Sequence, residues 1–112
     1  MKTFLTIFLV SLVAAIVSMT QIQPKEELPN LAVGKCVVQI NSDWNKANTY
    51  RWFNVPSTKY YFLSLDKFPE LKSKMKIKSV PTIIVLQDGK EIKRYEGGLM
   101  MRIDVQQQEI LR

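Results

Sequence analysis

The sequence predicts an α/β domain built on a mixed β-sheet with helices on both faces. Three short apolar or aromatic runs have the composition of strands, and helical segments separate them, which favours parallel pairing through crossover connections. A fourth run follows the third after an Asp-Gly turn signal, which indicates an antiparallel hairpin. The chain has 112 residues, of which 46% are hydrophobic and 23% charged, and this is enough for one such domain.

Residues 1–19 are expected to lie outside the fold, as a signal peptide or a membrane anchor. Lys2 gives a positive start, and the apolar run at 4–19 is shorter than the roughly 20 apolar residues of a membrane-spanning helix. The length favours a cleaved signal peptide, although bulky Ile16 lies two residues before Ser18 and makes the cleavage pattern poor. We therefore expect an exported protein (periplasmic, secreted or lumenal), or alternatively one that associates with a membrane through an uncleaved residue 4–19 anchor.

Residues 20–34 are predicted to be a tether, because they are largely polar and include two prolines. The domain is then residues 35–112. It opens with the apolar run at 36–40, which a glycine precedes and an Asn-Ser pair follows. That run is expected to be a buried strand.

The next two elements are a helix and a second strand. Ser42 or Asp43 is a candidate cap for a helix over about residues 44–53, which Pro56 cannot continue. The aromatic run at 60–65 then predicts the second strand.

A short helix is predicted to begin at Pro69, a residue that suits the first turn of a helix. The apolar residues Phe68, Leu71 and Met75 fall on one side of this helix, which ends near Lys76. The helix is therefore expected to cover the sheet with that side.

The remaining segment predicts a hairpin and a terminal helix. Residues 82–86 form the strongest strand pattern of the sequence, and 87–90 contain the Asp-Gly turn. Residues 91–95 are predicted to be the partner strand, although apolar and polar residues alternate only weakly in it. Two glycines, at 97 and 98, end this strand. Residues 102–111 are predicted to be a helix with few apolar positions.

The composition narrows the chemistry open to this chain. It has no histidine and a single cysteine, Cys36, so imidazole catalysis, imidazole metal ligands and an internal disulfide are excluded. No cofactor or metal is expected, and the balance is against an enzyme. The formal net charge is +6, and the lysines between 67 and 78 predict a solvated face or, alternatively, a surface for phosphate or anionic lipid. Nucleic acid is not expected as a partner, because no aromatic residues for base stacking accompany these lysines.

Residues 79–89, Ser-Val-Pro-Thr-Ile-Ile-Val-Leu-Gln-Asp-Gly, and the Tyr-Glu-Gly at 95–97 resemble the thioredoxin superfamily. In that family a Val-Pro-Thr or Ile-Pro-Thr opens the hairpin strand, and glycines mark its turn and the end of the partner strand. The resemblance implies a cis peptide bond before Pro81 and a loop in which the backbone of Val80, beside Thr82, meets extended peptide partners. The short region before the first strand implies a version of the fold that is reduced at its N-terminal side.

The redox motif of that family is altered in this chain. Where the family carries Trp-Cys-x-x-Cys, Trp44 keeps the tryptophan while Asn45 and Asn48 stand at the cysteine positions, and Gln39 stands at the position of a buried carboxylate. Thiol–disulfide exchange needs an attacking thiolate and a resolving thiol, and an amide can be neither. Cys36 is expected to pack as a small apolar residue, or alternatively to be a reactive thiol if it is exposed.

The sequence therefore predicts a redox-inactive thioredoxin-like domain that binds a protein or extended peptide through Trp44, Val80, Pro81 and Thr82. Two alternatives remain open: a divergent thiol–disulfide oxidoreductase that uses Cys36, and a membrane-associated structural subunit. A groove that exposes Trp44 and Pro81 would favour peptide binding, whereas a buried site would favour assembly. The ring of Trp44 packed beneath the loop is the alternative to its role as a contact residue.

Overall fold

The structure, a computed structural model, describes residues 27–112. The predicted signal peptide or anchor at 1–19 and the first part of the predicted tether lie outside the described residues. Within 27–112, no helix is both long enough and apolar enough to cross a membrane. Residues 27–34 form neither helix nor strand, and Leu28 and Leu31 pack against the core.

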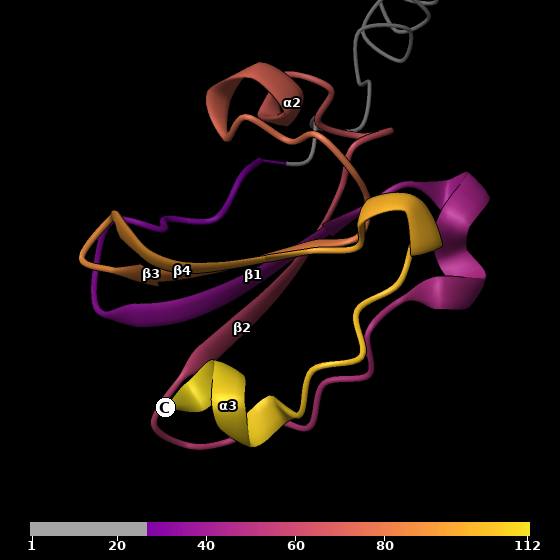
Figure 1. The fold of residues 1–112 in the computed structure, drawn as a ribbon. Helices are drawn as coiled ribbons and strands as arrows, with labels where there is room; N and C mark the ends of the chain where they lie inside the picture. Colours follow the sequence, from indigo (N-terminus) through magenta and orange to yellow (C-terminus); the bar gives the residue numbers. More distant parts are fainter. Residues whose placement is uncertain (1–26) are drawn as a thin grey trace, which may run out of the picture.

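Four strands form one mixed sheet in the order β2-β1-β3-β4 (Figure 1). They are β1 (Lys35–Asn41), β2 (Lys59–Ser64), β3 (Thr82–Gln87) and β4 (Lys90–Glu96). Strand β1 pairs in parallel with β2 and antiparallel with β3, which forms the predicted hairpin with β4. The mixed sheet is confirmed, but only the first strand-helix-strand unit gives a parallel pair, because β3 joins the sheet beside β1 and runs against it.

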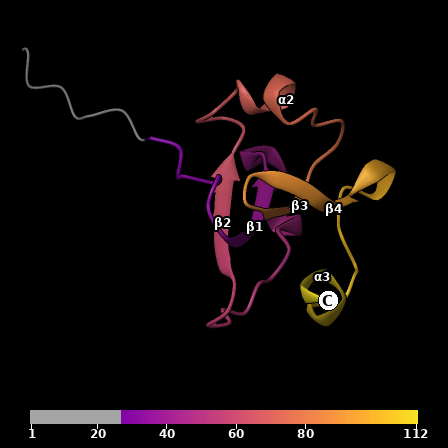
Figure 2. The same ribbon diagram turned by 90° about the vertical axis from the view of Figure 1, so that its left-hand side faces the viewer.

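Two short α-helices cover the two faces of the sheet, namely α2 (Leu71–Lys74) and α3 (Gln107–Leu111). Figures 1 and 2 show them on opposite sides of the strands. On one face Leu71 of α2 joins Val38 in a buried cluster, and on the other Ile110 of α3 joins Val37. Because neighbouring residues of β1 point to opposite faces, its apolar run is continuous rather than alternating. Each fully buried aliphatic side chain contributes roughly 1.5–3 kcal/mol to stability.

The hairpin turn has the predicted form, and the helix after Pro69 is present but shorter than predicted, at Leu71–Lys74. Asp88 and Gly89 have φ of 51° and 83°, the left-handed backbone that a two-residue hairpin turn requires. In α2, Leu71 is buried and Met75 packs partly buried against the same cluster. Lys76, with φ 52°, ends this segment.

The helix predicted over residues 44–53 is wrong in length. A 3-10 helix, η1 (Asp43–Asn48), ends at Asn48; Thr49 after it has an extended backbone, and no helix follows before β2. Ser42 precedes η1 but makes no side-chain capping bond. The cause is Gln39 of β1, whose amide pairs with both backbone groups of Tyr50. Its Oε1 accepts from the Tyr50 N–H at 2.7 Å, and its Nε2 donates to the Tyr50 carbonyl at 2.9 Å. Backbone groups used in this way are not available to helix hydrogen bonds.

The terminal helix predicted over residues 102–111 is also too long. Only α3 is helical, and the chain before it runs beside the extended segment at 49–53 (Figure 1). The hydroxyl of Tyr50 donates to the Val105 carbonyl at 2.6 Å. Gln107 pairs with the backbone of Phe53, accepting from its N–H at 2.8 Å and donating to its carbonyl at 2.6 Å. Gln107, at the start of α3, therefore ties the C-terminal part of the chain to the segment at 49–53.

A groove at the cis-proline end of the sheet

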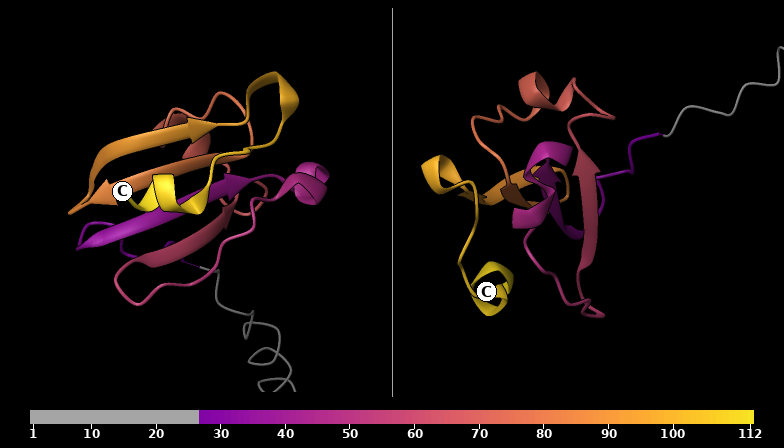
Figure 3. Two further views of the ribbon diagram at one scale, coloured as in Figure 1. Left: turned by 60° about the horizontal axis from the view of Figure 1, so that its bottom comes forward. Right: turned by 90° about the vertical axis from the view of Figure 1, so that its right-hand side faces the viewer.

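Three segments meet at the end of the sheet where β1 finishes and β3 begins. Helix η1 follows β1, the loop at 77–81 leads into β3, and a second 3-10 helix, η2 (Gly98–Met100), follows β4. Figures 1 and 3 show η1 and η2 at the same end of the molecule. The residues that the resemblance assigns to the redox motif and to the proline loop are therefore brought together here, whereas Cys36, the possible reactive thiol, lies elsewhere.

Asn45 joins these three segments. It is 4% exposed, and its Nδ2 lies 3.2 Å from the carbonyl oxygen of Val80, 3.0 Å from that of Met101 and 3.1 Å from Asn41 Oδ1. Two N–H groups of one amide are thus shared among three acceptors. Asn41, also buried, donates in return to the Asn45 carbonyl at 3.1 Å. An amide at the first cysteine position therefore makes contacts that hold η1, the proline loop and the chain after η2 in place.

Asn48 and Trp44 lie on either side of Asn45 in η1. Asn48 is exposed, and its Nδ2 donates to Asn45 Oδ1 at 2.9 Å, so the two positions assigned to the redox pair are in direct contact. Trp44 is 68% exposed, so its ring does not pack beneath the loop. Of the four predicted binding side chains, Trp44 is the one that solvent reaches freely.

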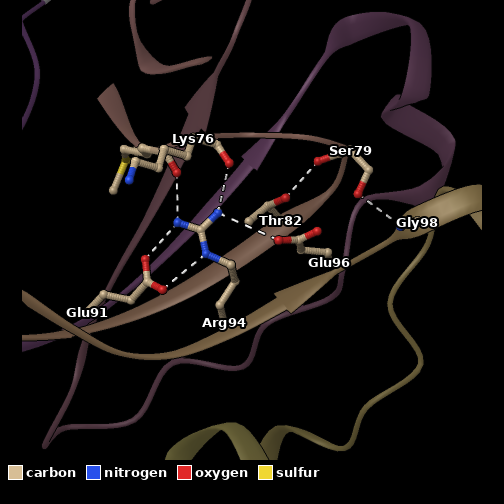
Figure 4. A network of polar contacts seen from close by, with 8 residues as sticks. Lys76, Ser79, Thr82, Glu91, Arg94, Glu96 and Gly98 are labelled. Carbon is tan, nitrogen blue, oxygen red and sulfur yellow. Dashed lines mark hydrogen bonds and ion pairs between the residues drawn. The ribbon is translucent and has the colours of Figure 1, made fainter. Parts of the chain in front are cut away.

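The other three predicted binding residues, Val80, Pro81 and Thr82, are buried. The peptide bond between Val80 and Pro81 is cis. Thr82 is 0% exposed, and its hydroxyl donates to the Ser79 carbonyl at 2.6 Å (Figure 4). Thr82 thus shapes the loop from within, and the loop offers little side-chain surface of its own.

Gly97 fits closely against this loop. Its N–H donates to the Pro81 carbonyl at 2.8 Å, and a Cβ at this position would lie 2.9 Å from the Val80 carbonyl oxygen and 3.0 Å from the Arg102 nitrogen. The next N–H, that of Gly98, donates to Ser79 Oγ at 3.0 Å (Figure 4). The glycine predicted to end β4 is required here because a side chain has no room.

A groove of about 610 Å³ lies between the three segments. Its apolar lining includes Trp44 of η1, Val80 of the loop, and Leu99 and Met101 around η2. Leu99 is 99% exposed and Met101 is 43% exposed. These two residues were not predicted from the sequence. The signal available was an apolar Leu-Met-Met run directly after two glycines, with no element predicted to bury it.

Gln39 lies behind the site, fully buried on β1. Besides its two bonds to the Tyr50 backbone, its Nε2 donates to the Tyr60 hydroxyl at 2.6 Å. Burial raises the pKa of the Tyr60 phenol, and the hydrogen bond from Gln39 partly opposes that rise. An uncharged amide at the position of the family's buried carboxylate is thus fully engaged in structural bonds.

Cys36 lies at the opposite end of β1 from the groove, roughly 16 Å of strand away from Asn41. It is 1% exposed, and burial raises the pKa of its thiol, an effect that Lys59 partly opposes. Its thiolate is therefore disfavoured, as expected for a cysteine that packs as an apolar residue. Within residues 27–112, no group of three Asp, Glu, Cys or His side chains is placed to hold a metal ion.

Comparisons with known proteins agree with this fold. No family model and no curated protein matches the chain. Among solved structures, the thioredoxin of Malassezia sympodialis is similar, with a TM-score of 0.50 and 14% identity over 59% of this chain and 67% of that one. A designed protein is also similar, with a TM-score of 0.51 and 16% identity over 73% of this chain and 81% of that one. Identities this low show the fold alone: the chain has a thioredoxin-like fold that lacks the Cys-x-x-Cys pair.

Proposed function

We propose that this thioredoxin-like domain binds an extended segment of another protein in the groove beside Val80, without catalysing thiol–disulfide exchange. The observation that carries the proposal is the exposed apolar lining of the groove. Trp44 and Leu99 are 68% and 99% exposed. Large apolar side chains gathered in this way around a hollow are typical of binding sites, and tryptophan is among the residues that contribute most to binding energy.

The absence of redox chemistry is supported by the amide side chains in the motif. Asn45 and Asn48 bond to one another and to the surrounding backbone, and neither can attack or resolve a disulfide. The one thiol of the chain, Cys36, is buried at the other end of β1. These contacts describe a site whose polar groups hold a fixed shape, which suits binding more than exchange.

The redox part of the proposal is tested by reduction of insulin disulfides with dithiothreitol as the electron donor. The natural chain should be inert, and a variant with both Asn45→Cys and Asn48→Cys should gain activity, because the two cysteines would stand beside the cis-proline loop. Activity in the natural chain that Cys36→Ala abolishes would instead make Cys36 the site and refute the proposal.

The binding part is tested by probing arrays of unstructured peptides with the purified chain. Trp44→Ala should lose most of the signal, because it removes the largest exposed ring of the groove. Phe53→Ala is a matched control, since Phe53 is 66% exposed, close to the value for Trp44, and does not line the groove. Equal loss in both variants, or in neither, would contradict binding at this groove.

A further inference from the structure

Two lysines add positive charge to the apolar groove. Lys72 on α2 and Lys78 in the loop before Ser79 both line it, and both are exposed. Neither ammonium group forms a hydrogen bond or an ion pair with any residue between 27 and 112. Exposed lysines are common, but two unpaired ones on the rim of one apolar hollow present an uncompensated charge to whatever enters it.

The one acidic residue of the lining does not cancel this charge. Glu96 lies 3.8 Å from Nη1 of Arg94 (Figure 4). Nη2 of the same guanidinium contacts Glu91 at 2.7 Å. The same guanidinium donates to the carbonyls of Met75 and Lys76 at the end of the α2 segment. Arg94 therefore offsets the charge of Glu96 only in part, but the lining has two lysines against one glutamate, so its formal charge stays positive.

We infer that the groove takes an acidic extended peptide, whose apolar side chains contact Trp44 and Leu99 and whose carboxylates face Lys72 and Lys78. This inference rests on the proposed function and specifies its partner. Apolar contacts would supply most of the affinity, while the two lysines would select against basic or neutral segments of the same shape.

The shape of the site favours a peptide over a lipid surface with the same negative charge. The lysines and the apolar residues line a hollow framed by η1, the loop at 77–81 and η2, rather than a convex face. An extended chain can enter such a groove, whereas the flat surface of a bilayer would reach only its rim. The negatively charged partner is therefore an acidic protein segment rather than a membrane.

The test is fluorescence anisotropy with three short peptides that carry the same leucines, with Glu, Gln or Lys between them and a neutral dye. The Glu peptide should bind about tenfold more tightly than the Gln peptide, since each exposed ion pair contributes a factor of roughly two to five. The Lys72→Gln, Lys78→Gln double variant should bind the Glu peptide as weakly as the Gln peptide. Added salt should reduce the preference in the natural chain.

A double variant with Lys74→Gln and Lys90→Gln is the matched control. Lys74 is exposed on the same helix as Lys72 but does not line the groove, and Lys90 starts β4. This control should keep the preference for Glu. Equal binding of the Glu and Gln peptides would refute the charge inference while the proposed function stands. No binding of any peptide, with Lys72- and Lys78-dependent binding to phosphatidylglycerol vesicles, would refute both in favour of a membrane surface.

Discussion

Two parts of this small domain are stabilised by different kinds of contact. The central strands β1 and β3 are almost entirely buried, and Val37 and Ile84 are among their 0% exposed residues. The adjacent segments at 49–53 and 102–107 also contribute to the apolar cluster on the α3 face through Ile103, but their backbone is in addition fixed by the side-chain amides of Gln39 and Gln107. Apolar burial tolerates small changes of geometry, whereas a paired amide fixes one backbone conformation.

The sharpest way to test this difference is to replace Gln39 by leucine, a side chain of similar size. The Tyr50 N–H, the Tyr50 carbonyl and the Tyr60 hydroxyl would all lose their partner within a partly buried site. Because each buried group left unpaired costs about 1–3 kcal/mol, we expect a loss of about 4 kcal/mol in the free energy of unfolding. Urea denaturation followed by circular dichroism measures it.

Gln107→Leu is the matched control for that experiment. Gln107 makes the same two-point contact with Phe53, but at the exposed edge of the domain. Water can replace its bonds there, so the expected loss is about 1 kcal/mol. Similar losses in the two variants would mean that burial of the amide at Gln39 does not matter, and that the two parts of the molecule differ less than their contacts indicate.

The same difference explains how far the sequence could predict the structure. Strand β3 and its Asp-Gly turn were predictable, because apolar periodicity and turn chemistry depend on neighbouring residues. The extended backbone at Tyr50 was not, because its cause is the side chain of Gln39, eleven residues earlier. A lone glutamine in an apolar strand indicates a buried bond but not its partner. In the same way, Asn45 could be placed at the site by resemblance, but its bond to Met101 spans 56 residues.

Asn45 gives the next largest expected effect. Asn45→Ala leaves the carbonyls of Val80 and Met101 without this donor in a largely buried site, and should cost about 3 kcal/mol in the free energy of unfolding. Asn48→Ala, at an exposed position with one bond to Asn45, should cost about 0.5 kcal/mol. Hydrogen exchange should also accelerate at the Gly97 and Met101 amides in the first variant only. Slow exchange there would show that Asn45 does not hold η2 against the loop.

A smaller effect separates steric fit from backbone conformation beside the groove. Gly97 has φ −67°, which suits any residue, so the cost of Gly97→Ala arises from its Cβ against the Val80 carbonyl oxygen. We expect Gly97→Ala to lose about 2 kcal/mol in the free energy of unfolding and to bind peptides more weakly, because the loop must move. Gly98→Ala has open space around its Cβ but φ of 61°, and should cost about 1 kcal/mol in the free energy of unfolding. If Gly97→Ala binds peptides as well as the natural chain does, the position of Val80 is not critical to the groove.

The smallest effect concerns the exposed ion pair behind the groove. The hydrogen bond from Arg94 lowers the pKa of Glu91 below 4.5, against a weaker opposing effect of desolvation. The stability that the Arg94–Glu91 pair adds to the fold is therefore present above pH 4.5 and is lost as the pH falls through the lowered pKa of Glu91. Because Glu91 is 44% exposed, solvent screens the pair, and we expect no more than about 0.5 kcal/mol. The difference in unfolding free energy between the natural chain and Glu91→Gln should shrink from that value at pH 6 to near zero at pH 3. A difference that stays constant with pH would mean that the ion pair contributes nothing. Arg94 would then act through its hydrogen bonds to the Met75 and Lys76 carbonyls, which do not titrate, and so would fix backbone as Gln39 and Gln107 do.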